Sequence, residues 1–123
     1  GDLAAVVAAA ATGRLAGHDV AWRPETALTV VMASRGYPGP YEKGSAIRGI
    51  AEAERTGAVV FHAGTETRGG ETVAIGGRVL GVTASGTDVA AARAAAYEAV
   101  AAIDWPEGFF RGDIGAGAPK HGA

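Results

Sequence analysis

The sequence predicts an α+β domain, in which a small, mostly antiparallel sheet follows an N-terminal helix and carries a long C-terminal helix on one face. Three observations predict this class. Short stretches rich in Val and Phe are separated by glycine pairs, apolar residues recur at helical spacing over 87–103, and a shorter helical pattern opens the chain. A run of strands followed by a helix is typical of α+β folds.

The composition limits the classes of function. The chain has 123 residues, 48% hydrophobic and 20% charged, which is enough for one domain with its own core. A net charge of −2 provides no basic excess for nucleic-acid binding. The absence of cysteine excludes disulfides, thiolate catalysis and cysteine zinc sites, and it fits a cytoplasmic protein. No apolar stretch is long enough to cross a bilayer.

The first element is a predicted helix from Leu3 to about Leu15, with Asp2 as its N-cap. Gly13 and Gly17 are expected to end it. Its buried face is expected to hold the apolar residues at helical spacing, Leu3, Val6, Val7 and Ala10. Because the chain starts without a methionine and enters this helix at once, we expect it to be a piece of a longer protein.

The next elements are a strand, a loop and an ambiguous segment. Residues 27–34 are apolar or small on both faces, which predicts an interior strand. Several Gly and Pro residues make 35–44 a loop. Residues 45–50 fit either a short strand or a helical turn, and 51–55 favour a brief helix.

Two glycine pairs then organise the middle of the chain. Gly tolerates positive φ at both central positions, so Gly69-Gly70 and Gly76-Gly77 are each expected to form a two-residue hairpin turn. The turns separate three successive predicted strands, 58–67, 71–75 and 78–84. The sequence therefore predicts an antiparallel meander with Arg78 at its last turn.

The C-terminal helix is predicted from Thr87, its expected N-cap, with Asp88 favouring the positive helix end. It ends before Trp105-Pro106, and Phe109-Phe110 is expected to add a short strand or plug. Its buried face consists of residues spaced by three or four, Val89, Ala92, Ala96, Val100 and Ile103. The small and polar residues of 116–123 predict a flexible tail.

Most local motifs are excluded as catalytic sites. Lys43 precedes Gly44, whereas a phosphate-binding P-loop needs its lysine after the second glycine. The three histidines have no metal-ligand spacing, and His62 is expected to be a half-buried histidine bonded to a backbone carbonyl. No Gly-x-Ser-x-Gly nucleophile motif is present. We therefore assign no catalytic residue and no metal ligand.

Two features remain as candidate binding residues. Arg78 follows a glycine pair, where a ligand can approach backbone and guanidinium together; the alternative is a structural arginine that bonds loop carbonyls or a carboxylate. Tyr37-Pro38 lies in a glycine-flanked loop that leaves the interior strand. For the tyrosine, the alternative is a ring that covers an edge of the core.

Four segments, in order, resemble one family. They are Val31-Met32-Ala33-Ser34-Arg35-Gly36-Tyr37-Pro38-Gly39-Pro40-Tyr41-Glu42-Lys43-Gly44, Phe61-His62-Ala63-Gly64-Thr65, Gly76-Gly77-Arg78-Val79-Leu80-Gly81-Val82-Thr83-Ala84 and Phe110-Arg111-Gly112-Asp113-Ile114-Gly115. With the helix over 87–103 between the last two, this pattern resembles the C-terminal region of the glycinamide ribonucleotide synthetase (phosphoribosylamine–glycine ligase) family, from about residue 2 to 115.

The resemblance implies part of an ATP-grasp enzyme of purine biosynthesis. That family joins glycine to phosphoribosylamine through a glycyl phosphate, with ATP and Mg (or Mn) as cofactors. The implied division is 1–16 as a linking helix from an ATP-grasp domain absent from this chain, 17–115 as a C-terminal cap, and 116–123 as a flexible tail. The implied cap fold is a small barrel-like sandwich with a rudimentary hybrid motif.

The resemblance also implies partners and site residues. The cap would close the active-site cleft against the N-terminal and ATP-grasp domains of the same enzyme, would contact only small-molecule substrates, and would be inactive and bind no cofactor alone. Gly36, Tyr37, Pro38 and Arg78 match the family's motif and are expected to face the cleft. Arg78 would suit the phosphate of phosphoribosylamine or of a nucleotide.

Two other classes of function are considered. Small barrel-like sandwiches also serve as biotinyl or lipoyl carriers, for which Lys43 is the candidate lysine, although it lacks a Met-Lys-Met or Asp-Lys-Ala setting. The other class is a scaffold or dimerisation module, which light scattering of the isolated chain would test.

Overall fold

The computed structural model describes residues 1–18 and 20–117. Along this part of the chain the elements are α1 (Leu3–Ala11), β1 (Thr26–Ser34), β2 (Ala46–Ile47), α2 (Ile50–Arg55), β3 (Val59–His62), β4 (Thr65–Arg68), β5 (Glu71–Ala74), β6 (Arg78–Gly86), α3 (Val89–Ala101) and β7 (Gly108–Phe110). Residues 45–55 thus contain both a short strand and a brief helix. Most of the predicted tail, 118–123, lies outside the described residues.

The strands form two antiparallel sheets. Sheet A has the order β3-β6-β1-β7 and sheet B the order β2-β5-β4. The predicted α+β class is confirmed, and β1 is interior as expected. Within the described residues the sheets stay open and do not close into a barrel.

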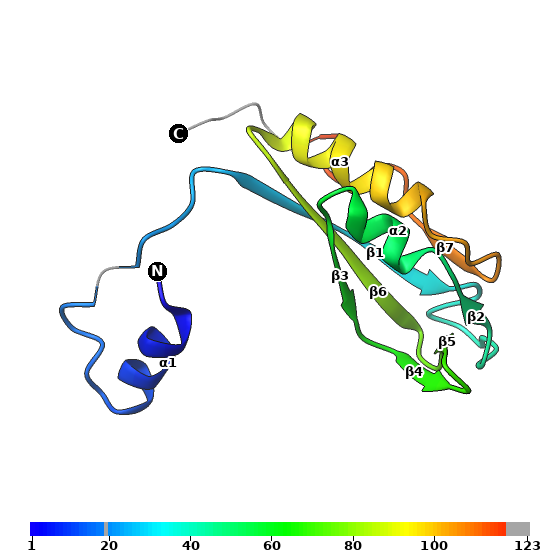
Figure 1. Ribbon diagram of the computed structural model, residues 1–123, viewed down its shortest axis with the longest axis horizontal. Helices are drawn as coiled ribbons and strands as arrows, with labels where there is room; N and C mark the ends of the chain where they lie inside the picture. Colours follow the sequence, from blue (N-terminus) through cyan, green and yellow to red (C-terminus); the bar gives the residue numbers. More distant parts are fainter. Residues whose placement is uncertain (19, 118–123) are drawn as a thin grey trace.

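Helix α3 covers one face of sheet A, and α2 packs beside it (Figure 1). The predicted helix face is confirmed, since Ala92, Ala96 and Val100 are buried against the sheet. Val30 of β1 pairs with Val82 of β6, and both are fully buried. Each such aliphatic side chain contributes about 1.5–3 kcal/mol through its removal from water, so this layer holds the domain together.

The cap of α3 differs from the prediction by one residue. Asp88, not Thr87, is the N-cap: its extended backbone precedes the helix, and its Oδ1 accepts a hydrogen bond from the Ala91 amide at 2.8 Å. The helix ends at Ala101, two residues before the predicted end at Ile103.

The predicted strand over 58–67 is wrong, because β3 and β4 belong to different sheets. The chain bends at Gly64, whose backbone packs directly against Gly76; a Cβ on Gly64 would lie 2.6 Å from the Gly76 Cα. Gly69-Gly70 forms the predicted turn, with φ of 57° and 86°. Gly76-Gly77 is not a hairpin turn, since the chain crosses there from sheet B to sheet A. The predicted meander therefore holds only for its first turn.

Helix α1 and the segment after it extend away from the sheets (Figure 1). The helix has the predicted Asp2 cap but ends at Ala11 rather than Leu15. Its predicted buried face is wrong for this chain: Leu3 and Val7 are exposed, and only Ala9 is buried. Figure 1 shows no sheet or core helix against α1 among the described residues, so most of its apolar side chains stay exposed.

Candidate functional site

Two hydrogen bonds from Ser34, at the end of β1, position the loop that carries Tyr37. The buried Ser34 donates from its hydroxyl to the Gly76 carbonyl and from its amide to the Gly77 carbonyl, each at 2.8 Å. The Tyr37 amide then donates to the Ser34 carbonyl at 3.0 Å, and Gly36 adopts φ of 100° to allow this turn. The loop is thereby bonded to the second glycine pair, directly before Arg78.

Tyr37 lies against Gly77. A Cβ on Gly77 would collide with the tyrosine ring, so the absence of a side chain there makes room for it. The ring is half-buried and stands edge-on to Tyr41, with ring centroids 6.4 Å apart. The Tyr37–Pro38 peptide bond is cis, and Pro38 is exposed beyond the ring. Tyr37 therefore packs on the backbone at Gly77 and remains half-buried.

An irregularity in the pairing of β1 with β6 sets the direction of Arg78. Met32 pairs with Leu80, but Ala33 pairs with Arg78, so Val79 is an extra residue on β6. Without it, residues 84, 82, 80 and 78 would all face α3. A β-bulge changes the side of the sheet to which the residue next to the extra one points. Arg78 instead shares the side of Ala33, opposite the helices.

Arg78 is exposed, and among the described residues its guanidinium makes no ion pair and no hydrogen bond. The proposed structural role, bonding loop carbonyls or a carboxylate, therefore finds no support. An unengaged guanidinium offers a planar set of donors suited to phosphate or carboxylate.

A shallow groove of about 550 Å³ joins these residues to the uncovered side of sheet A. Its lining is mostly apolar and comes from β1, β3, β6 and the Tyr37 loop: Val31, Tyr37, Phe61, Ala63, Gly77, Arg78, Leu80 and Gly81. Of the four predicted site residues, the groove brings Tyr37 and Arg78 together. Gly36 and Pro38 flank the tyrosine but do not line it.

Sequence reasoning missed Phe61 and Val31 as part of this site. Their period-two spacing with Val59 and Thr29 was the available signal. That signal says which residues share a face but not whether the face is covered.

A second groove, of about 630 Å³, lies on the other side of the Tyr37 loop. Two cations and two anions line it, Arg35, Lys43, Glu42 and Glu107. The Arg35 guanidinium donates to the Pro106 carbonyl at 2.9 Å and is thus already engaged. A carrier lysine is expected at the tip of a hairpin. Lys43 lies instead in the loop between β1 and β2. The tip of the β4–β5 hairpin is Gly69-Gly70.

His62 is also placed differently from the prediction. It is exposed on β3, and its Nδ1 lies 3.0 Å from the Thr65 hydroxyl rather than from a backbone carbonyl. The histidine sits at the bend where the chain leaves sheet A, which explains its exposure.

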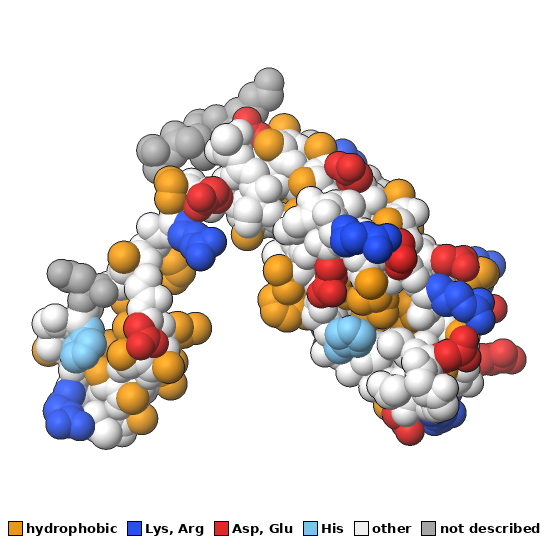
Figure 2. Space-filling model, viewed as in Figure 1, with side chains coloured by type: hydrophobic (Ala, Val, Ile, Leu, Met, Phe, Trp, Pro, Cys, Tyr) orange, Lys and Arg blue, Asp and Glu red, His pale blue; other side chains and the backbone are white. Residues whose placement is uncertain are grey.

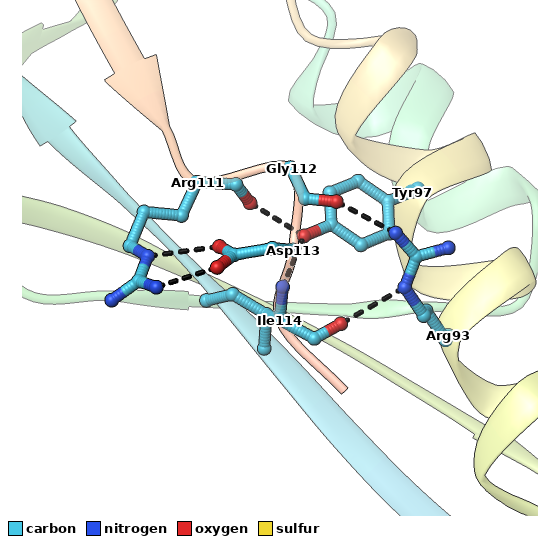
Figure 3. Close-up of polar contacts among 6 residues, drawn as sticks. All are labelled: Arg93, Tyr97, Arg111, Gly112, Asp113 and Ile114. Carbon is cyan, nitrogen blue, oxygen red and sulfur yellow. Dashed lines mark hydrogen bonds and ion pairs between the residues drawn. The ribbon is translucent and has the colours of Figure 1, made fainter. Parts of the chain in front are cut away.

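The segment after β7 is held on α3 by side chains that the sequence did not single out (Figure 3). Arg93 donates to the Ile114 carbonyl at 3.0 Å and to the Gly112 carbonyl at 2.6 Å. The Tyr97 hydroxyl donates to the Arg111 carbonyl and accepts from the Ile114 amide at 3.1 Å. We call Arg93, Tyr97 and residues 111–114 the C-terminal clamp.

One ion pair completes the clamp. Arg111 bonds Asp113 through two nitrogens, at 2.9 and 2.6 Å. The hydrogen bond from Arg111 lowers the pKa of the Asp113 carboxyl, and the same bond raises the pKa of the Arg111 guanidinium. Both side chains are exposed, so the pair orients the segment more than it stabilises the domain.

Within the described residues, no three His, Asp or Glu side chains gather in a way that would hold a metal ion. No helix there is long and apolar enough to cross a membrane.

The fold is an α+β domain, and its groove presents an arginine and a tyrosine at the end of an uncovered sheet face. Residues 27–117 match the family model described as "Phosphoribosylglycinamide synthetase, C domain". The chain belongs to this family, as the resemblance in its sequence predicted.

Individual relatives agree. The chain is 57% identical over 114 residues to the phosphoribosylamine–glycine ligase of Mesorhizobium japonicum, covering 93% of this chain and 27% of that protein. It is 57% identical over 117 residues to the chloroplastic phosphoribosylamine–glycine ligase of Arabidopsis thaliana, covering 93% and 22%. The crystal structure of the Thermotoga maritima phosphoribosylamine–glycine ligase matches with a TM-score of 0.64 at 36% identity, over 72% of this chain and 21% of that one. The chain thus spans about a quarter of these relatives.

Proposed function

We propose that this chain is the cap domain of a phosphoribosylamine–glycine ligase, an ATP-dependent enzyme that joins glycine to phosphoribosylamine in purine biosynthesis. Two lines support the proposal. The chain belongs to the C-domain family of that enzyme, and relatives at 57% identity carry its name. In this proposal residues 1–16 link the cap to an ATP-grasp body, and the enzyme acts in the cytoplasm.

Within the enzyme, Arg78 and Tyr37 form part of the wall of the substrate cleft. The observation that carries this is an exposed guanidinium that has no partner among residues 1–18 and 20–117, placed beside a half-buried tyrosine on the uncovered side of the sheet. The guanidinium binds a phosphate, that of phosphoribosylamine or of the nucleotide, and the ring packs against the bound molecule. Gly36 and Pro38 hold the tyrosine loop in place.

By the family resemblance, Mg (or Mn) and the body of the ATP site are assigned to the ATP-grasp part of the enzyme, to which this chain contributes at most Arg78 on a nucleotide phosphate. The cap alone is therefore proposed to be inactive. Calorimetric titration of the isolated chain with Mg-ATP tests this, and tight binding with turnover would contradict it. The barrel-like hybrid motif also stays a proposal; the chain crosses between sheets A and B at Gly64 and again at Gly76-Gly77, which supports it.

Replacing Arg78 in the full-length ligase tests the function. We expect Arg78→Ala to lower kcat/KM for one phosphate-bearing substrate by about tenfold to a hundredfold, since a hydrogen bond to a charged group is worth about 1.5–3 kcal/mol. The affected KM, that of phosphoribosylamine or that of ATP, identifies the phosphate. The control is Arg68→Ala, which removes an exposed arginine already paired with Glu66. Equal kinetics for both variants would refute the assignment.

A further inference from the structure

Ser34 is the one polar residue that is buried within the described part of the chain, with 3% of its surface exposed. Its hydroxyl donates to the Gly76 carbonyl and its amide to the Gly77 carbonyl, each at 2.8 Å. A buried hydroxyl has lost its bonds to water, so burial is costly unless the hydroxyl makes such a bond. Ser34 therefore extends the pairing of β1 beyond the end of β6, onto two residues that belong to no strand.

The same stretch of backbone is held from a second side by the bend between β3 and β4. The Gly64 amide donates to the Arg78 carbonyl at 3.1 Å, and the Ala63 amide donates to the Val79 carbonyl at 2.9 Å. The carbonyls of four successive residues, 76–79, are thus all hydrogen-bonded, and two of the four bonds come from the serine. The backbone that carries the arginine is therefore fixed on both sides.

The side chain of Arg78 has no comparable restraint. In the space-filling view, basic side chains over the sheet-bearing part of the molecule lie next to acidic ones (Figure 2). Arg48, Arg55 and Arg68 form ion pairs with glutamates. The Arg78 guanidinium forms no ion pair among the described residues. The place of this guanidinium is therefore set by the bonds of its own backbone.

Tyr37 depends on the same serine. Its amide donates to the Ser34 carbonyl at 3.0 Å, and its ring occupies the space where a side chain at Gly77 would stand. Both candidate binding side chains of the groove are thus placed by Ser34. The tyrosine is tied to the serine carbonyl, and the arginine follows directly on the two carbonyls that the serine bonds.

We propose that Ser34 is a positioning residue of the ligase, which sets the place of Arg78 relative to Tyr37 by holding the backbone of Gly76-Gly77. The proposal rests on the proposed function for the role of Arg78. A group that binds a reacting substrate must be held to within about 0.5 Å of its productive position. Ser34 is too buried to touch a ligand itself, so it acts through the arginine.

Deleting the hydroxyl in the full-length ligase tests the proposal. Ser34→Ala removes the bond to the Gly76 carbonyl, and we expect kcat/KM to fall by about threefold to tenfold. The loss should appear for the same phosphate-bearing substrate that Arg78→Ala affects. The control is Thr56→Val, which removes a hydroxyl that donates to the Ala53 carbonyl at 2.7 Å, at the end of α2. Kinetics of Ser34→Ala that match those of the control would overturn the proposal.

A double variant separates positioning from a general loss of structure. If Ser34 acts through Arg78, Ser34→Ala adds nothing once the arginine is gone, so kcat/KM of the double variant should equal that of Arg78→Ala to within about twofold. Losses that multiply would show that the serine acts independently of the arginine and would overturn the proposal.

Hydrogen exchange measured by mass spectrometry on the full-length ligase reports the backbone itself. In Ser34→Ala we expect peptides that cover 76–79 to exchange at least about threefold faster than in the unaltered ligase, because one of their restraints is lost. Unchanged exchange would mean that the serine hydroxyl does not hold this segment, which would also overturn the proposal.

The failure of this proposal can be told from the failure of the proposed function. If Arg78→Ala lowers kcat/KM while Ser34→Ala behaves as Thr56→Val does, the proposed function stands and the positioning role is wrong. If Arg78→Ala behaves as Arg68→Ala does, the phosphate contact is wrong, and the positioning role of Ser34 falls with it.

Discussion

The C-terminal clamp and the groove lined by Tyr37 and Arg78 both contain an arginine and a tyrosine. The side chains of the clamp pair are hydrogen-bonded to the backbone, whereas those of the groove pair have no such bonds among the described residues. In the clamp, Arg93 donates to two backbone carbonyls, and the Tyr97 hydroxyl both donates and accepts. In the groove, neither the Arg78 guanidinium nor the Tyr37 hydroxyl has a hydrogen-bond partner among the described residues. The same residue types are thus structural where the protein supplies their partners and available for a ligand where it does not.

The two arginines also differ in what surrounds their side chains. Arg93 lies over the Tyr97 ring, 4.7 Å from its centroid, and the Tyr97 ring meets Phe110 at 6.0 Å. The contact between Tyr97 and Phe110 ties β7 to α3. Arg78 instead projects from a bulge onto the side that no helix covers. Substitutions of Arg93 and Tyr97 in the clamp are therefore expected to lower the free energy of unfolding more than substitutions of Arg78 and Tyr37 in the groove.

The largest expected effect is at the bend beneath the groove. Gly64→Ala would place a Cβ 2.6 Å from the Gly76 Cα and 2.8 Å from the Arg78 carbonyl oxygen. Because backbone on both sides must move, we expect the free energy of unfolding to fall by about 3 kcal/mol. Gly112→Ala in the clamp is the control, since nothing lies within 4 Å of its Cβ. Urea denaturation measures both, and equal losses would contradict the packing described.

The next effect compares the two arginines. Arg93→Ala removes two hydrogen bonds to carbonyls and is expected to lower the free energy of unfolding by about 2 kcal/mol. Arg78→Ala removes none and is expected to change it by less than about 0.5 kcal/mol. Thermal unfolding of the two variants side by side decides this. A larger loss for Arg78→Ala would make that residue structural.

The tyrosines give a smaller contrast of the same kind. Tyr97→Phe deletes the hydroxyl that serves Arg111 and Ile114, and we expect a loss of about 1 kcal/mol. Tyr37→Phe is expected to leave stability unchanged, because the ring that packs on Gly77 is retained. The measurement is urea denaturation at neutral pH. Should Tyr37→Phe be the more costly change, its hydroxyl would have a structural partner.

The smallest expected effect is a pH dependence of the clamp. The pKa of Asp113 is lowered in the folded state, chiefly by its hydrogen bond with Arg111. Its contribution is therefore present above the ordinary carboxyl pKa of about 4 and is lost as the pH falls through the lower folded value. The protection of the Ile114 amide against hydrogen exchange, taken relative to the intrinsic rate at each pH, should fall at acid pH. Asp113→Asn should remove that change, and an unchanged pH profile in this variant would argue against the pair.

Two residues of the candidate groove were predicted because the order of the motifs identified the family, and their role at a substrate cleft stays a prediction. The segment Gly36-Tyr37-Pro38 and Arg78 were singled out as cleft-facing, and the structure brings the tyrosine and the arginine into one groove. The clamp was not found, because Arg93 and Tyr97 lie on a helix whose spacing reports only its apolar face. Their partners are backbone carbonyls, which leave no mark in a sequence.

Local sequence alone determined the α+β class, the apolar face of α3, the interior position of β1 and the turn at Gly69-Gly70, because periodicity and glycine conformation act over a few residues. Only the tertiary structure decided that β3 and β4 part at Gly64 and that Gly76-Gly77 crosses between sheets. It also decided the side on which Arg78 lies. One extra residue in the pairing of β6 with β1 turns the arginine away from the core, and pairing register is set between strands rather than within one.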